Sequence, residues 1–115
     1  MKRTFYIAGV QFRPKNEISQ AAKEMKVGDV LRLSPEPENP YDPNAVRIEF
    51  DMETTDIHTG GNIFLGYVPK KFSSEVAGML SIDAPLECIV DAVDPGAKTY
   101  EMFKVTVQTM EEENE

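Results

Sequence analysis

The segment 36–46 restricts the possible folds of this chain more than any other part of the sequence. Three prolines lie within it: Pro37, Pro40 and Pro43. Because proline lacks a backbone N–H and pushes the preceding residue toward extended geometry, the segment cannot be a regular helix or a central strand. Tyr41 and Asp42 stand between two of the prolines, so their side chains have little freedom. A loop this stiff loses little entropy when it binds a ligand, and we predict a binding loop.

Short runs of alternating apolar and polar residues make up much of the remaining sequence. Val46, Ile48 and Phe50 are apolar and the residues between them are charged, which is typical of a half-buried strand. Six strands are predicted in this way, at residues 4–12, 30–33, 45–51, 63–68, 86–92 and 103–107. Gly9 interrupts the first strand and indicates a bend or a bulge. The polar connection 52–62 and the turn 94–96 predict two hairpins.

Two stretches have helical periodicity instead. The apolar positions of the first are Ile18, Ala21, Ala22 and Met25, and this helix ends before Gly28. Those of the second are Phe72, Val76, Met79 and Leu80, with Ser73 or Ser74 as the N-cap. About six strands with two short helices predict a mainly β fold, a small closed or partly open barrel rather than a parallel sheet.

The charge of the chain limits its partners. A length of 115 residues fits one domain, which we place at residues 1–110. The formal net charge of -8 argues against a general nucleic-acid coat protein. Four glutamates of this charge lie in 111–115, which we predict to be a disordered acidic tail. The basic residues form small groups that could converge into one modest patch or remain solvated: Lys2 with Arg3, Arg13 with Lys15, and Lys70 with Lys71.

The amino-terminal run and the cysteine content bear on location. Residues 5–10 are mostly apolar and follow a basic start, but Gln11 and Arg13 end the run before it reaches the length of a secretory signal. No stretch approaches the ~20 apolar residues that span a bilayer. Cys88 is the only cysteine, so no intramolecular disulfide can form, and its place on the apolar side of a strand predicts a core residue. We therefore expect a cytoplasmic protein without membrane association.

The sequence offers no catalytic constellation. His58 is the only histidine, so neither a zinc site nor a histidine-activated nucleophile is supported. Asp51, Glu53 and Asp56 imitate a calcium loop but lack its turn glycine. Neither standard glycine-rich phosphate loop occurs. We predict a protein that is not an enzyme and uses no metal or cofactor.

The aromatic and basic residues favour a binding surface. Phe12, Tyr41 and Tyr67 lie near predicted strand ends beside polar or basic residues, where a ring can stack on an unpaired base. Packing at the rim of the core is an equal alternative for Phe12 and Tyr67. Lys70 and Lys71 follow a strand end and could meet phosphates. The Asp42 carboxylate would need a donor such as a sugar hydroxyl or an amine, unless it only closes its own turn.

Four segments together resemble a known family. They are residues 7–12 (IAGVQF), 28–31 (GDVL), 36–46 (EPENPYDPNAV) and 65–69 (LGYVP). In this order they resemble the HIRAN domain, with the proline-flanked block as the most specific part. The resemblance implies an OB-like or SH3-like barrel that binds single-stranded DNA at a free 3′ end. The family occurs within DNA-remodelling translocases and as small bacterial proteins, and this chain looks like a stand-alone, bacterial-type member.

The resemblance also implies roles for individual residues. Tyr41 and Phe12 would hold the terminal bases, and Asp42 would accept a hydrogen bond from the terminal 3′-hydroxyl. Asn39 and Lys70 would make polar contacts nearby. Two positions depart from the pattern, because Gln11 stands where eukaryotic DNA-binding members carry an arginine and Phe12 replaces a tyrosine. This sequence therefore lacks the positive charge that would contact a phosphate at position 11, and it lacks the ring hydroxyl at position 12.

From these arguments we predict a non-catalytic module that recognises the free 3′ end of single-stranded DNA, in DNA repair or processing. The predicted contact residues are Phe12, Arg13, Asn39, Tyr41, Asp42, Tyr67, Lys70 and Lys71. The alternative is a protein-interaction or regulatory adaptor that uses the same rigid loop, or a strand edge, to hold a partner in DNA processing.

Overall fold

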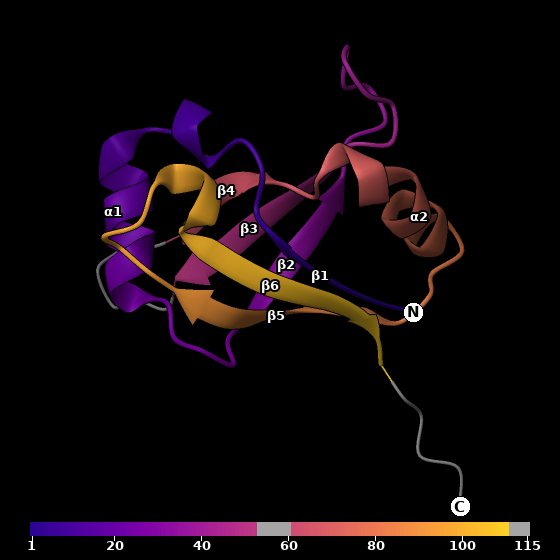
Figure 1. The fold of residues 1–115 in the computed structure, drawn as a ribbon. Coiled ribbons are helices and arrows are strands. Elements are labelled where there is room, and N and C mark those ends of the chain that lie inside the picture. The colour runs from indigo at the N-terminus through magenta and orange to yellow at the C-terminus, as the bar shows by residue number, and fades with distance from the viewer. Residues whose placement is uncertain (53–60, 111–115) are drawn as a thin grey trace, which may run out of the picture.

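In the computed structural model, which describes residues 1–52 and 61–110, six strands and two α-helices form a mainly β fold (Figure 1). The strands are β1 (Lys2–Tyr6), β2 (Val30–Pro35), β3 (Val46–Met52), β4 (Gly61–Tyr67), β5 (Leu86–Val93) and β6 (Phe103–Thr109). The helices are α1 (Lys15–Glu24) and α2 (Lys70–Ser81), with 3-10 turns η1 (Val10–Phe12) and η2 (Thr99–Glu101). The predicted fold class is confirmed.

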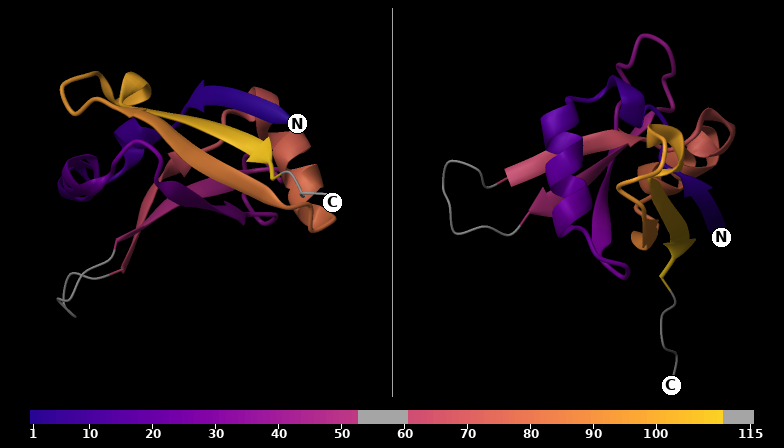
Figure 2. Two further views of the ribbon diagram at one scale, coloured as in Figure 1. Left: turned by 90° about the horizontal axis from the view of Figure 1, so that it is seen from below. Right: turned by 60° about the vertical axis from the view of Figure 1, so that its left-hand side comes forward.

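The strands form one antiparallel sheet in the order β1-β6-β5-β2-β3-β4. β2 belongs to both halves of the sheet, the half with β1, β6 and β5 and the half with β3 and β4. Its residues Val30 and Leu31 pair with β5, whereas the following residues pair with β3. The sheet bends there, so that β1, β6 and β5 lie across β3 and β4 (Figure 2). Strands that change partners in this way turn the corner of a small barrel.

The two edges of the sheet meet at one point. Ala8 and Tyr67 form an antiparallel bridge with N···O distances of 2.9 and 2.8 Å. Gly66 permits this approach, because a Cβ on it would overlap the carbonyl oxygen of Ala8. Since no continuous ladder joins β1 to β4 among the described residues, the barrel is partly open.

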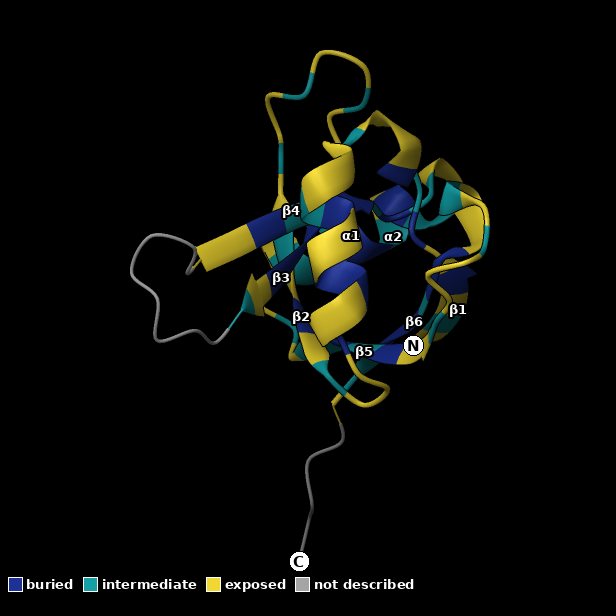
Figure 3. Cartoon of the chain, turned by 90° about the vertical axis from the view of Figure 1, so that its left-hand side faces the viewer, coloured by how far each residue is buried: buried dark blue, intermediate teal, exposed yellow. Residues whose placement is uncertain are grey.

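The core fills the space between the two halves of the sheet and beneath α1 (Figure 3). The predicted apolar stripe of α1 faces this core, with Ile18, Ala21 and Ala22 buried. Cys88 is also fully buried, as predicted, and burial raises the pKa of its thiol to about 12. The thiol is therefore neutral and packs as an apolar group.

Three local predictions are wrong. The first strand ends at Tyr6 rather than at residue 12, because Gly9 adopts a left-handed backbone (φ 78°) and the chain enters η1. α2 begins earlier than predicted, because it begins directly after Pro69, as α1 does after Pro14. The proline φ angle suits a helix start, so neither Ser73 nor Ser74 is the N-cap of α2.

Several sequence-based predictions lie outside the described residues. They concern the connection within 53–60, with Glu53, Asp56 and His58, and the acidic segment 111–115. The strands on either side of the connection pair antiparallel from Met52 with Gly61, which confirms the hairpin arrangement. None of the described helices has the length and apolar character needed to cross a bilayer.

Candidate functional site

A groove of about 620 Å³ runs between the proline loop, residues 36–45, and the η1 segment, residues 9–13. Its lining is Ala8, Gly9, Phe12, Arg13, Glu36, Asn39, Pro40, Tyr41, Asp42, Ala45, Phe64, Tyr67, Val68 and Lys70. The fold therefore brings together seven of the eight residues predicted from sequence. Lys71 does not line the groove, and its ammonium lies 5.0 Å from the centre of the Phe72 ring.

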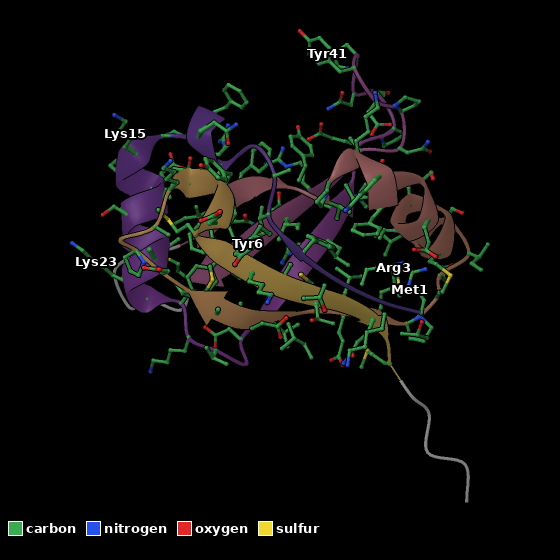
Figure 4. All side chains as sticks on the ribbon, in the orientation of Figure 1. Met1, Arg3, Tyr6, Lys15, Lys23 and Tyr41 are labelled. Atoms are coloured by element: carbon green, nitrogen blue, oxygen red, sulfur yellow. The ribbon has the colours of Figure 1, made fainter. Side chains whose placement is uncertain are left out.

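Two aromatic rings stand free at the rim of the groove. The Tyr41 residue is 90% exposed and the Phe12 residue is 81% exposed. Figure 4 shows Tyr41 at the outer end of the proline loop, pointing away from the barrel. Their exposure leaves both ring faces available to a ligand, whereas Tyr67 is half-buried in the floor.

The proline loop is tied together by its own polar groups. The Asn39 side-chain oxygen accepts hydrogen bonds from the backbone N–H groups of Tyr41, at 2.8 Å, and Asp42, at 3.0 Å. Backbone bonds then close the base of the loop, from the N–H of Glu36 to the oxygen of Ala45 and from the N–H of Ala45 to the oxygen of Asp42. Together with the prolines, these bonds hold Tyr41 and Asp42 in one orientation.

Among the described residues, each carboxylate oxygen of Asp42 accepts one hydrogen bond. The backbone N–H of Asn44 donates to Oδ1 at 2.8 Å, and the hydroxyl of Ser73 donates to Oδ2 at 2.9 Å. Ser73 belongs to the first turn of α2, where a helix favours a nearby negative charge. Because a carboxylate can accept about four hydrogen bonds, Asp42 keeps acceptor capacity toward the groove.

A polar network forms the floor of the groove. The Tyr67 hydroxyl donates to Glu36 Oε1 at 2.9 Å, and Asn39 donates to the same oxygen at 2.9 Å. Burial, followed by the hydrogen bond to Glu36 and its negative charge, raises the pKa of Tyr67. Glu36 also pairs with Arg47 at 3.5 Å, and Arg47 pairs with Glu49 at 3.1 Å. In this floor the Tyr67 hydroxyl is therefore neutral, and the Glu36 carboxylate beside it is paired with Arg47.

Phe64 lies in this floor between two guanidinium groups. The central carbons of Arg13 and Arg47 are 4.0 and 3.9 Å from the centre of its ring. The Tyr67 ring meets Phe64 edge-on at 5.2 Å between ring centres. Arg13 is fixed further by a 3.1 Å hydrogen bond from Nε to the Phe64 carbonyl oxygen. Among the described residues, the terminal nitrogens of Arg13 form no hydrogen bond, so both are available to a ligand.

Comparison with known proteins identifies the fold. The HIRAN domain family model matches residues 3–108. The chain belongs to the HIRAN domain family. The resemblance found in the sequence is thereby confirmed, and the HIRAN family is associated with DNA binding.

Two solved structures show the same HIRAN fold. A protein from Lactobacillus plantarum is 19% identical, with a TM-score of 0.67, and the match covers 93% of this chain and 95% of that one. The HIRAN domain of human HLTF is 16% identical, with a TM-score of 0.56, and the match covers 92% of this chain and 70% of that one. A comparison with the curated proteins finds no match.

The groove of this HIRAN domain is far less acidic than the chain as a whole. Its charged lining residues are Arg13 and Lys70, which are positive, and Glu36 and Asp42, which are negative. They sum to zero, against -8 for the whole sequence. The lining therefore tolerates an anionic ligand without attracting it strongly.

Sequence reasoning missed Glu36, Phe64 and Ser73. Phe64 and Glu36 belong to segments that were interpreted as a strand and as the start of the loop, and no local pattern shows that both line one groove. Ser73 lies 31 positions from Asp42 in the chain. The partners of Glu36 and Phe64, which are Tyr67 and Arg13, are also far away in the chain, so no local signal was available for these residues.

Proposed function

We propose that this HIRAN domain binds the free 3′ end of single-stranded DNA in its groove, as a non-catalytic module in DNA repair or processing. The observation that carries the proposal is the pairing of an exposed ring and a groove-lining carboxylate, Tyr41 and Asp42, on one rigid loop. Had the ring been buried, or had the carboxylate bonded only to its own loop, this reading would have no support.

The terminal bases would stack on the two rim aromatics. Tyr41 and Phe12 both line the groove, one from the proline loop and one from η1, so one base can meet each ring. Stacking of this kind is worth about 1 to 3 kcal/mol per base and shows little base preference. We therefore expect binding that is insensitive to sequence.

The Asp42 carboxylate would distinguish a free 3′-hydroxyl from a 3′-phosphate. Asp42 repels phosphate groups but can accept a hydrogen bond from a terminal hydroxyl. A 3′-phosphate in the same place would bring two negative groups together, so the site favours an unmodified end.

Two cations would contact the backbone of the strand. Arg13 and Lys70 both line the groove, and among the described residues neither forms a salt bridge. The eukaryotic DNA-binding members carry an arginine at the position of Gln11, and Arg13 offers a guanidinium two positions later. Two phosphate contacts give a salt dependence of about -1.4 in log K against log salt, a shallow slope.

Fluorescence anisotropy with labelled oligothymidylates tests the proposal. The oligonucleotide with a free 3′-hydroxyl should bind more tightly than the same strand with a 3′-phosphate. Asp42→Asn should reduce this difference, while Tyr41→Ala and Phe12→Ala should weaken both strands by up to the stacking energy of one base. Equal affinity for the two ends rules out hydroxyl recognition.

Lys70 and its neighbour provide a matched pair of variants. Lys70→Ala should weaken every strand alike, because it removes a phosphate contact, whereas Lys71→Ala removes the same charge outside the groove lining. If no oligonucleotide binds at low salt, nucleic-acid recognition fails and a protein partner becomes the better explanation of the groove.

A further inference from the structure

A second groove lies on the other side of Arg13. It has a volume of about 430 Å³ and is formed by α1, the η1 segment and the turn that carries η2. Most of its lining surface is apolar, and the buried residues Val10, Ile18, Ala22 and Met102 contribute to its floor. Arg13 lines both this groove and the one between η1 and the proline loop, so the two grooves are adjacent at that side chain.

One face of α1 forms a wall of this second groove. Lys15, Ile18, Ser19, Ala22 and Lys23 line it, and they recur at i, i+3, i+4, i+7 and i+8. Figure 4 places Lys15 near the start of α1 and Lys23 near its end. At 1.5 Å per residue, their Cα atoms are about 12 Å apart along the helix axis. That length corresponds to about three stacked nucleotides at 3.4 Å each.

The charge of the second groove is opposite to that of the chain. Its lining includes three cations, Arg13, Lys15 and Lys23, and no carboxylate. Among the described residues none of the three forms a salt bridge. A groove with an apolar floor and cations along its edge, in a chain of net charge -8, complements a ligand with flat apolar faces and a negative backbone.

We propose that the second groove holds the nucleotides that precede the bound 3′ end, so that the strand passes over Arg13 from one groove into the other. This inference rests on the proposed function and extends it from an end-binding pocket to a longer path along the strand. Bases would lie against the apolar floor that Ile18 and Met102 help to line, and Lys15 and Lys23, about 12 Å apart, would contact phosphates separated by about three nucleotides. The number of nucleotides held by the two grooves together then falls within the ~4 to 16 nucleotides that an OB-fold barrel covers.

Amide chemical-shift mapping of the full chain with oligothymidylates of two and eight nucleotides tests the path. The shorter strand should shift resonances of the proline loop and of η1 only. The longer strand should add shifts along residues 15–23 and 95–102, and should bind more tightly. An eight-nucleotide strand that shifts only the first set overturns the proposal and leaves end recognition intact.

A double variant separates the second groove from the first. Lys15→Ala with Lys23→Ala should abolish the extra affinity of the longer strand and reduce its salt slope by about 1.4, while the two-nucleotide strand binds as before. Lys2→Ala with Lys26→Ala is the control, because it removes the same charge from exposed residues that line neither groove. Equal effects of the two double variants would show that only the overall charge matters.

Two further results would contradict the proposed path of the strand. If neither strand binds, both the path and the proposed function fail. If a polyglutamate peptide shifts residues 15–23 and the longer strand does not, the groove belongs to an acidic protein partner and the path is wrong.

Discussion

The two walls of the first groove present similar aromatic rings but are held in different ways. The proline loop is pinned by side chains, since Asn39 and Asp42 accept three backbone N–H bonds within the loop. The η1 segment has no side-chain cap and is held by backbone bonds and by the buried Val10. Tyr41 thus depends on a polar network, whereas Phe12 depends on the closure of the barrel.

Because of this difference, the two walls should be sensitive to different amino-acid substitutions. Removing a polar side chain should loosen the proline loop and leave the barrel intact. Crowding the bridge between Ala8 and Tyr67 should displace η1 and open the barrel. Tyr67 connects the two, because its backbone bonds Ala8 and its hydroxyl bonds Glu36.

Gly66→Val should have the largest effect. The new side chain would overlap the Ala8 carbonyl and the Ile7 side chain, so the bridge that holds the η1 wall must break. We expect a loss of about 3 kcal/mol or more in the free energy of unfolding, measured by urea denaturation.

Gly78→Ala is the control for this substitution. A Cβ at Gly78, within α2, meets nothing within 4 Å, so the change should be neutral or stabilising by up to about 1 kcal/mol. Equal losses at the two glycines would contradict the proposed dependence of the η1 wall on close backbone approach.

Asn39→Ala should have an intermediate effect, confined to the other wall. Two backbone N–H groups would lose their acceptor and Glu36 would lose a donor. We expect a loss of about 1 to 2 kcal/mol in the free energy of unfolding. Amide exchange should quicken at Tyr41 and Asp42 and stay unchanged at Phe12.

Asn44→Ala serves as the comparison within the same loop. Among the described residues, the Asn44 side chain forms no hydrogen bond, although its backbone N–H does. Faster exchange at Tyr41 in this variant too would mean that the loop is not held by Asn39.

Tyr67→Phe should have the smallest effect and should depend on pH. Its pKa is raised in the folded state, so the unfolded chain releases this proton first and stability falls as pH rises above about 10. The variant lacks this decline, and at neutral pH it loses less than about 1 kcal/mol with the hydroxyl bond.

Denaturation across alkaline pH measures this difference. Cys88 contributes a decline of the same sign from about pH 9, because its folded pKa is about 12, so both proteins should lose stability with pH. An alkaline slope unchanged in Tyr67→Phe would mean that Tyr67 ionises alike in the folded and unfolded chains.

Much of this organisation follows from local sequence. The prolines around Tyr41 and Asp42 predict a rigid exposed loop, and alternation predicts the strand that anchors it at Val46. Both signals are local, because proline restricts its own φ angle and strand side chains alternate regardless of their partners. Seven of the predicted contact residues share one groove, while their role in binding stays a prediction.

The sequence by itself determined the strands, the stiff loop and the family; only the tertiary structure decided how their side chains combine. The contact of Asp42 with Ser73, the stacking of Arg13 and Arg47 on Phe64 and the groove beside α1 all join distant segments. Such contacts depend on strand order, bend and register across the whole barrel, which no local pattern encodes. The sequence therefore indicates which residues are available for binding, and the closure of the barrel places them on common surfaces.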